Sequence, residues 1–266
     1  MIPLHVSSGV RQAQRDSHNM APALDALSPD ATAALGADGF VVLAGPFSPS
    51  EIGALQTAYD RAVATAAPED TRRGSASTRV TDFVNRESIF DSIYTWPAAL
   101  DAARRVVGSA FRLSAFHART LHSQASAQEL HVDVPRSSDA WPMLGLILMV
   151  DAFRPDNGAT RFIPGSHRRL ETPSAALAGA LARHPAEVLA CGPAGSAILF
   201  NASTWHGHTG NSSRSPRRSL QATFIPVTGR PATDFHARMP LEVRARLSPV
   251  AHGLLGLDAE FRAAPV

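Results

Sequence analysis

The segment FRLSAFHARTLHSQ, residues 111–124, decides the fold class of this chain. Its apolar and polar residues alternate with a period of two, which is the pattern of a β-strand. His117 and His122 are five positions apart, an odd offset, so the alternation places them on opposite faces. The face that includes His117 also holds Phe111, Leu113, Ala115 and Arg119.

Further strands are predicted downstream, and helices upstream. Apolar runs bounded by Gly, Pro, Asn or Asp lie at 143–153, 195–200 and 219–227. Helical periods occur at 28–39, where Ser28 is the predicted N-cap, at 48–67, with Ser48 or Ser50 as cap, and at 98–108. Residues 240–257 predict a peripheral helical end. This order favours an α+β fold with a double-stranded β-helix (jelly-roll) core and flanking helices.

Composition bounds the domain organisation and the function classes. The 266 residues are 44% hydrophobic and 18% charged, which suits one core. We predict a single domain over residues 28–266 after a leader, residues 1–27, that is either flexible or a lid. The net charge of +2 is too small to indicate a nucleic-acid-binding protein. No apolar run is long enough for a membrane span and no signal peptide is evident, so a cytoplasmic protein is expected.

Two absences restrict the chemistry. The single cysteine, Cys191, excludes an internal disulfide and a cysteine-built metal cage, and the absence of lysine excludes a lysine Schiff base.

The Arg- and Asp-rich segment 68–97 predicts a long loop with short helical pieces. Loops of this length in a compact domain are often functional, although a solvated surface excursion is the alternative. We expect substrate to enter over this loop and the leader. Five arginines are candidates to receive an anionic group there: Arg72, Arg73, Arg79, Arg86 and Arg136.

A candidate metal site begins with His131-Val132-Asp133. If this triplet is a strand, its first and third side chains share a face and reach one ion. His206, just after the apolar run 195–200, supplies a second imidazole. Two histidines and one carboxylate leave positions open on an octahedral ion, as in non-haem Fe(II) oxygenases, whereas a structural zinc site needs a fourth ligand.

An arginine pair follows His206 along the chain. Strand alternation groups Arg217 with Ser219 and Gln221, which suits a polar cavity wall, and Arg218 with Leu220. We therefore choose Arg217 to bind a carboxylate through its planar guanidinium.

These residues resemble the phytanoyl-CoA dioxygenase superfamily of Fe(II)/2-oxoglutarate oxygenases. That family combines H-x-D, an NG…PGSH stretch, and a distal His followed by Asn and Arg five and eleven positions later. Here the corresponding residues are His131 and Asp133, the stretch NGATRFIPGSH at 157–167, then His206, Asn211 and Arg217. The segment 37–55 also resembles the family's N-terminal part, and NGAT with IPGSH is closest to the branch active in secondary metabolism.

The resemblance implies that His131, Asp133 and His206 bind Fe(II) and that Arg217 binds the C5 carboxylate of 2-oxoglutarate, with Thr160 as a further contact. The implied reaction consumes O2, releases succinate and CO2, and oxidises a small molecule, most simply by hydroxylation. Desaturation, ring closure and epoxidation are the alternatives. Because Asp133 is present, the resemblance argues against the halogenating relatives, which have a small residue there.

Several histidines and tryptophans near this motif have simpler interpretations. His208 stands where several relatives have a hydroxyl, and it competes with His206 as the distal ligand; the spacing to Asn211 and Arg217 favours His206. We expect His167 to order the PGSH turn. Trp141 and Trp205 are expected in the core.

Two other function classes remain open: a jelly-roll binding module without redox chemistry, and a metal-dependent hydrolase. The hydrolase would need a general base beside the ligands, and the HVDVP segment supplies no second carboxylate.

Overall fold

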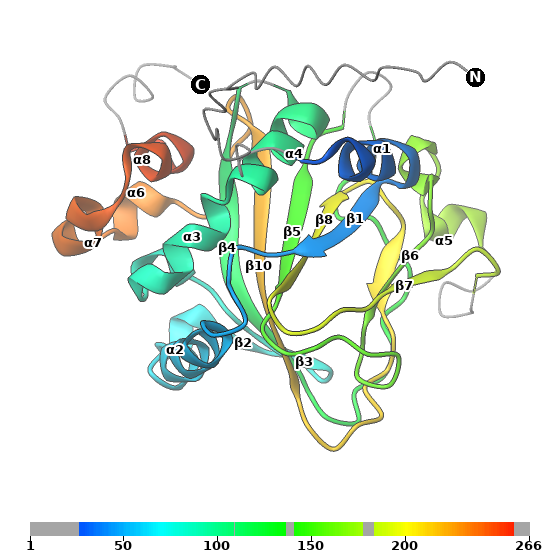
Figure 1. The fold of residues 1–266 in the computed structure, drawn as a ribbon, viewed down its shortest axis with the longest axis horizontal. Helices are drawn as coiled ribbons and strands as arrows, with labels where there is room; N and C mark the ends of the chain where they lie inside the picture. Colours follow the sequence, from blue (N-terminus) through cyan, green and yellow to red (C-terminus); the bar gives the residue numbers. More distant parts are fainter. Residues whose placement is uncertain (1–26, 109, 137–140, 178–183, 258–266) are drawn as a thin grey trace, which may run out of the picture.

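Two antiparallel sheets form the centre of the protein (Figure 1). The computed structural model describes residues 27–108, 110–136, 141–177 and 184–257. The larger sheet consists, in spatial order, of β1 (Phe40–Ala44), β8 (Ser196–Asn201), β5 (Leu144–Met149), β10 (Arg217–Pro226), β4 (Phe111–Leu121), β3 (Ser77–Val80) and β2 (Thr71–Arg73). The smaller sheet consists of β7 (Val188–Ala190), β6 (Thr160–Phe162) and β9 (His206–His208). This arrangement confirms the predicted α+β jelly roll.

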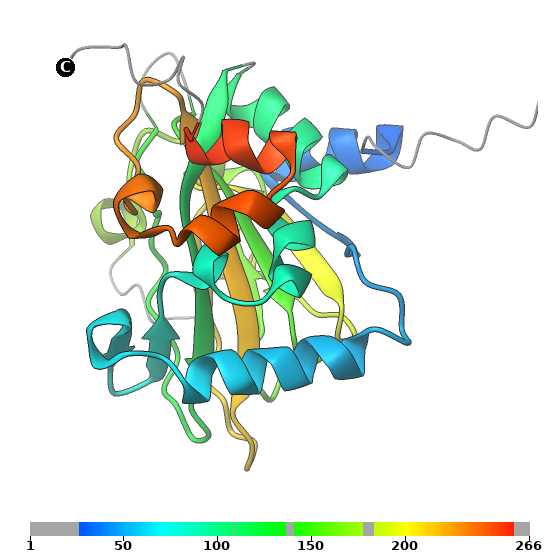
Figure 2. The same ribbon diagram turned by 90° about the vertical axis from the view of Figure 1, so that its left-hand side faces the viewer.

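Most of the described helices cover the face of the larger sheet that lies away from the smaller one, whereas α5 lies beside the smaller sheet (Figures 1 and 2). The described helices are α1 (Pro29–Asp38), α2 (Ile52–Ala64), α3 (Asp91–Tyr94), α4 (Pro97–Val107), α5 (Pro173–Ala176), α6 (Phe235–Arg238), α7 (Leu241–Arg246) and α8 (Pro249–Leu255). Single 3-10 turns lie at Pro68–Asp70, Phe83–Asn85, Ser88–Phe90 and Ser166–Arg168. The predicted helical end is confirmed as α7 and α8. In the part of the chain that the structure describes, every helix is too short or too polar to cross a membrane.

The predicted N-cap is correct for α1 and wrong for α2. The Ser28 side chain accepts a hydrogen bond from the Ala31 N–H, and α1 ends at Gly39, whose φ of 84° favours glycine. The prediction that Ser48 or Ser50 caps α2 is wrong. Glu51 occupies the cap position, and its carboxylate accepts hydrogen bonds from the Ser48 N–H and hydroxyl at 2.7 and 2.6 Å.

A β-bulge in β4 interrupts the alternation of faces that the sequence predicted. The partner of Thr223 on β10 is Ala115, but the partner of Phe224 is Leu113, so Ser114 is an extra residue. Its hydroxyl and carbonyl oxygens accept hydrogen bonds from the backbone of residues 232 and 233. Consequently Leu113 faces the helices, whereas Ala115 and the alternate residues after it face the smaller sheet.

The segment 68–97 is not the long loop that we predicted. Residues 71–80 form the hairpin β2–β3, which extends the larger sheet beside β4. Short helical turns and α3 account for much of the remainder, as predicted. The leader lies outside the described residues except for Leu27, which is buried and whose N–H donates to Asp101.

Apolar residues fill two layers. One layer lies between the larger sheet and the helices, and the other lies between the two sheets. In the second layer Phe162 of β6 stacks on Phe40 of β1, with ring centroids 4.4 Å apart. Beside this packing, the sheets enclose the cavity described next.

Candidate active site

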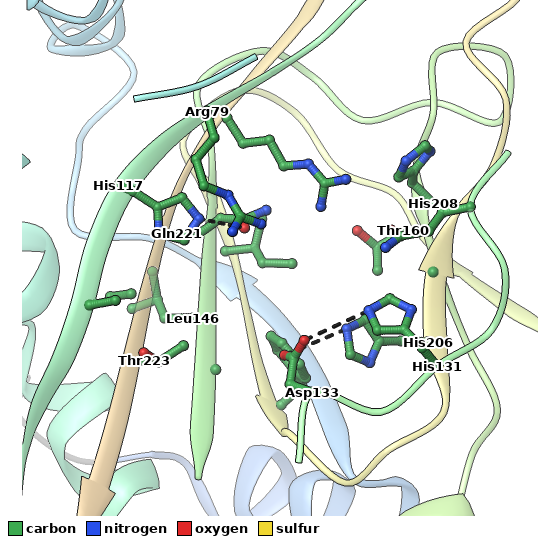
Figure 3. A pocket seen from close by; sticks show the side chains of 18 of the residues that line it. Arg79, His117, His131, Asp133, Leu146, Thr160, His206, His208, Gln221 and Thr223 are labelled. Atoms are coloured by element: carbon green, nitrogen blue, oxygen red, sulfur yellow. Dashed lines mark hydrogen bonds and ion pairs between the residues drawn. The ribbon is translucent and has the colours of Figure 1, made fainter. Parts of the chain in front are cut away.

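His131, Asp133 and His206 converge at one point between the two sheets (Figure 3). Nε2 of His131 lies 3.7 Å from Oδ1 of Asp133, and Nε2 of His206 lies 3.7 Å from Oδ2. The donor atoms all lie within 4.8 Å of one another. The three residues expected to bind a metal are therefore brought together by the fold.

The H-x-D triplet reaches this position without being a strand, contrary to our expectation. His131 forms only an isolated bridge with His206, in which each N–H donates to the other carbonyl at 2.9 Å. The Asp133 N–H donates to the carbonyl of Ala202 at 3.0 Å. These bonds tie the triplet to the strand ends around His206, so backbone pairing with a distant segment fixes the donors.

A glycine permits this close approach. A Cβ atom on Gly207 would lie 2.8 Å from the carbonyl oxygen of Glu129 and 3.0 Å from that of Gln128. Because both distances are shorter than ordinary contacts, any larger residue here would push the segment that carries His131 away from β9.

Hydrogen bonds set the tautomer of both imidazoles. Nδ1 of His131 lies 3.1 Å from the Glu129 carbonyl, and Nδ1 of His206 lies 2.8 Å from the Thr204 carbonyl. A carbonyl only accepts, so each Nδ1 carries a proton, and Nε2 is the ring atom of each histidine that lies toward Asp133. Imidazoles oriented in this way are typical of metal ligands.

The carboxylate at this point is ionised at neutral pH. Burial raises the pKa of Asp133, but the neighbouring His206 and His131 lower it further, and the pKa lies below its usual range. Burial lowers the pKa of His206, which keeps its ring neutral. The set is thus one carboxylate oxygen and two imidazole nitrogens, a donor set that suits a divalent iron ion.

The described residues supply three donors and no fourth. No further His, Cys, Asp or Glu of the described chain joins the group, and Cys191 is exposed elsewhere. Side-chain exposures of 34% for His131 and 35% for Asp133 show that this side of the group is open to the cavity. An ion held here would keep coordination positions for other ligands.

The cavity beside the group has a volume of about 280 Å³. Its wall combines apolar residues such as Ile147 and Phe200 with polar ones, and Asp133 is its one carboxylate among the described residues. Arg217 and Thr160, both expected at the co-substrate site, line this cavity.

Arg217 is a buried cation without a carboxylate partner among the described residues. Its exposure is 3%, its guanidinium carbon lies 4.0 Å from the centre of the Phe153 ring, and its Nε makes no hydrogen bond. Burial, with a smaller effect of Arg119, lowers the pKa of Arg217 to about 9. A carboxylate ligand would compensate this charge, so the site suits an anion.

Arg218 differs as the alternation predicts. It lies on the opposite face of β10, where it pairs with Asp151 at 2.7 Å and Asp60 at 2.8 Å. Its charge is therefore already compensated.

Thr160 and His208 are direct partners on β6 and β9, and both line the cavity. Nδ1 of His208 donates to the Thr209 carbonyl at 2.9 Å, and burial lowers its pKa to about 4. His208 is not part of the converging group, so the geometry favours His206 as the distal donor.

Asn211 orders the turn between β9 and β10. Its side-chain nitrogen donates to the carbonyls of His122 and Ser215, both at 2.9 Å, and its Oδ1 accepts from the Ser213 N–H. The Asn in the H…N…R spacing thus sets the turn that leads into Arg217.

The PGSH turn is ordered as expected, and its histidine lies outside the metal group. His167 is buried and its carbonyl accepts from the Trp141 indole at 3.1 Å. Ser166 accepts from the Trp205 N–H at 2.8 Å. Trp205 is buried, whereas Trp141 is only half-buried and covers the turn, so its expected core position is wrong.

Sequence reasoning missed several cavity residues. Gln128 and Arg119 line the cavity and were not singled out, whereas Gln221 lines it as its grouping with Arg217 predicted. Nε2 of His117 donates to Oε1 of Gln221 at 3.1 Å. His122 instead contacts Thr78, so the two histidines do lie on different faces. The strand alternation contained the signal for Gln221 and His117.

Of the five arginines expected at the entrance, Arg79 lines the cavity. Arg86 pairs with Asp70, and Arg136 donates to the carbonyl of Arg168. These two are engaged in structural contacts. Arg72 and Arg73 are exposed on β2.

Comparisons with known proteins assign the chain to a family. A family model described as phytanoyl-CoA dioxygenase (PhyH) matches residues 35–219. The dioxygenase trt7 of Aspergillus terreus is 29% identical over 249 residues, a match that covers 82% of this chain and 80% of trt7. The dioxygenase cdmA of Talaromyces verruculosus is 33% identical over 143 residues, covering 49% of this chain but only 45% of cdmA.

A solved structure shares the fold. The epimerase SnoN, in complex with Fe3+, alpha ketoglutarate and nogalamycin RO, superposes with a TM-score of 0.61 at 24% identity, over 76% of this chain and 86% of SnoN. The family match covers well over half of the sequence and includes all three converging residues. The chain belongs to the phytanoyl-CoA dioxygenase family of 2-oxoglutarate-dependent non-haem iron oxygenases.

Proposed function

We propose that this enzyme hydroxylates a small molecule of secondary metabolism, with His131, Asp133 and His206 as ligands of Fe(II) and Arg217 as the residue that binds the C5 carboxylate of 2-oxoglutarate. Thr160 is a further contact to the co-substrate. The observation that carries the proposal is the buried, uncompensated Arg217 in the same cavity as a group of three donors with open positions.

The protein residues have separable roles in this proposal. The Nδ1 hydrogen bonds of His131 and His206 keep both Nε2 lone pairs directed at the ion. Arg217 binds the C5 carboxylate of the co-substrate through the charge and the paired N–H donors of its planar guanidinium. Ile147 and Phe200 form an apolar wall that limits water around the site. With Fe(II) and 2-oxoglutarate bound, the site supplies the oxidising power of O2, and succinate and CO2 are released.

Hydroxylation is the simplest outcome that this site supports, and relatives show why it needs a test. SnoN is described as an epimerase, so the same fold serves more than one oxidation. Product analysis by mass spectrometry distinguishes a gain of one oxygen from desaturation, ring closure or epimerisation. A cytoplasmic location is part of the proposal.

The first experiment is an anaerobic titration with Fe(II) and 2-oxoglutarate, monitored by the visible charge-transfer absorption of the chelated complex. Wild type is expected to show the band, His131→Ala to lose it, and Arg217→Ala to need at least tenfold more 2-oxoglutarate. Arg218→Ala is the matched control, since it removes the adjacent arginine from the opposite face. If wild type binds a metal but shows no band, the co-substrate assignment is wrong and the hydrolase or binding-module interpretation replaces it.

A further inference from the structure

Three arginines form a row across neighbouring strands of the larger sheet. Arg72 on β2 is the direct partner of Arg79 on β3, and Arg79 is the direct partner of Arg119 on β4. Direct cross-strand partners point to the same face of a sheet. Arg79 and Arg119 both line the cavity, so that face is the one toward the metal-binding group.

The arginine row has no internal compensation. None of its members forms an ion pair with a described carboxylate, and Arg119 has one described hydrogen bond, from Nε to the Ser77 hydroxyl at 3.4 Å. By contrast, Arg86 pairs with Asp70 in the same region of the chain. Like charges directly opposite each other destabilise a sheet, so the row carries a cost that a bound anion would offset.

The charge of the cavity leads to the same conclusion, an argument that rests on the proposed function. Arg79, Arg119 and Arg217 line the cavity against a single carboxylate, Asp133. The charges of Fe(II) and of the 2-oxoglutarate dianion cancel each other. Binding of both therefore leaves the excess of two positive charges unchanged, and a further anion is needed to reduce it.

The three cavity arginines differ in depth. Arg217 is buried, Arg119 is half-buried and Arg79 is exposed, so they are graded from the interior of the cavity to its mouth. In Figure 3 Arg79 reaches into the cavity from the side of His117 and Gln221, across from Thr160 and His208. Arg217 is thus available to the co-substrate, and the pair nearer the mouth to a second ligand.

We propose that the substrate is a small organic anion whose carboxylate or phosphate is bound between Arg79 and Arg119, with Arg72 at the entrance. Planar guanidinium groups bind both kinds of oxyanion through paired hydrogen bonds. The cavity volume of about 280 Å³, shared with 2-oxoglutarate, limits the part of the substrate that enters.

The test measures binding to the anaerobic enzyme loaded with Fe(II) and 2-oxoglutarate. The probes are matched sets: phenylacetate with phenylacetamide, hexanoate with hexanamide, and phenyl phosphate with phenol. The melting temperature at increasing probe concentration gives each apparent Kd. We expect at least one anion to bind tenfold or more tightly than its neutral match, and the identity of that anion distinguishes carboxylate from phosphate recognition.

The variants are Arg79→Gln and Arg119→Gln, with Arg73→Gln as matched control. Arg73 lies on the same hairpin but is paired with Thr78, so it is on the other face. We expect the preference for anions to fall at least tenfold in the first two variants and to persist in the control. If no anion binds more tightly than its neutral match in wild type, the proposal is overturned.

A second readout distinguishes this proposal from the proposed function. The charge-transfer titration of Arg119→Gln should need the same 2-oxoglutarate concentration as wild type. If Arg119→Gln instead needs tenfold more co-substrate and keeps the preference for anions, the arginine row serves 2-oxoglutarate and the proposal is wrong. If wild type shows no band, the proposed function fails, while the preference for anions is still measured on the metal-free protein.

Discussion

The backbones of His131 and His206 hold each other through two reciprocal hydrogen bonds of 2.9 Å. These two residues are the two imidazoles of the proposed metal site, so the bridge fixes their spacing in the ligand-free fold. The bridge depends on the small residue next to His206, which allows the two segments to approach.

Gly207→Ala is therefore expected to weaken metal binding more than it weakens the fold. Its Cβ would meet the Glu129 carbonyl at 2.8 Å and displace the segment that carries His131. We expect the Kd for Fe(II), measured anaerobically, to rise about tenfold or more. Gly36→Ala is the control, because no atom lies within 4 Å of a Cβ built there. An unchanged Kd in Gly207→Ala would contradict the role assigned to the bridge.

Arg217→Met should stabilise the ligand-free protein while removing its response to 2-oxoglutarate. The variant replaces a buried charge that has no carboxylate partner among the described residues with an apolar side chain beside Phe153. Such replacements commonly raise the free energy of unfolding by about 1–2 kcal/mol. Urea unfolding with and without 2-oxoglutarate measures both effects, and a less stable ligand-free variant would refute the account.

Acid should destabilise the protein partly through His117. Burial lowers the pKa of His117 to about 3 in the folded state, from an ordinary value of 6.5. The unfolded chain therefore takes up a proton below pH 6.5 that the folded protein does not take up until about pH 3. The contribution of His117 to the free energy of unfolding is therefore fully present above pH 6.5. It falls by about 1.4 kcal/mol per pH unit as the pH drops from 6.5 toward 3.

The check is urea unfolding at several pH values between 7.5 and 4.5, for wild type and His117→Gln. The variant keeps a hydrogen-bonding group beside Gln221 and should show a shallower loss of stability. Equal slopes for the two proteins would mean that His117 is not protonated on unfolding in this range.

The ion pair between Arg161 and Glu187 should be costly to break from one side. Its atoms are 3.0 Å apart and its side chains are 3% and 8% exposed, and Arg161 also donates to the Gln128 carbonyl at 2.9 Å. Glu187→Ala leaves the guanidinium charge without this carboxylate, which should cost about 3 kcal/mol.

Two further variants test the cause of that loss. The double variant Arg161→Met/Glu187→Ala should lose less than Glu187→Ala alone, because no charge remains without its carboxylate. Glu87→Ala removes the exposed pair with Arg61 and should cost much less stability than Glu187→Ala, because water already screens this pair. A double variant less stable than Glu187→Ala would point to packing rather than charge.

The sequence predicted the strands well because apolar alternation and turn residues are local signals. β4, β5, β8 and β10 lie where the periodicity indicated, and the choice between Arg217 and Arg218 followed from alternation alone. The alternation failed at Ser114, where the bulge depends on hydrogen bonds to residues 232 and 233.

Two other errors have the same physical cause, which is pairing with a distant part of the chain. The hairpin 71–80 has no apolar alternation of its own, and it becomes a strand pair because β4 offers an unpaired edge. The H-x-D triplet was expected on a strand, but its donors are set by pairing with residues 202 and 206. Partners far along the chain decide both features, and a local pattern does not contain them.

The separation of the proposed metal donors along the chain has a consequence for the lifetime of the protein. His206 joins His131 and Asp133 only when the two sheets have assembled, so the unfolded chain offers no comparable site. An ion that binds the folded form alone adds about 2.7 kcal/mol of stability at a concentration one hundred times its Kd. The supply of metal in the cell would then set how much of this enzyme escapes degradation, before any substrate is present.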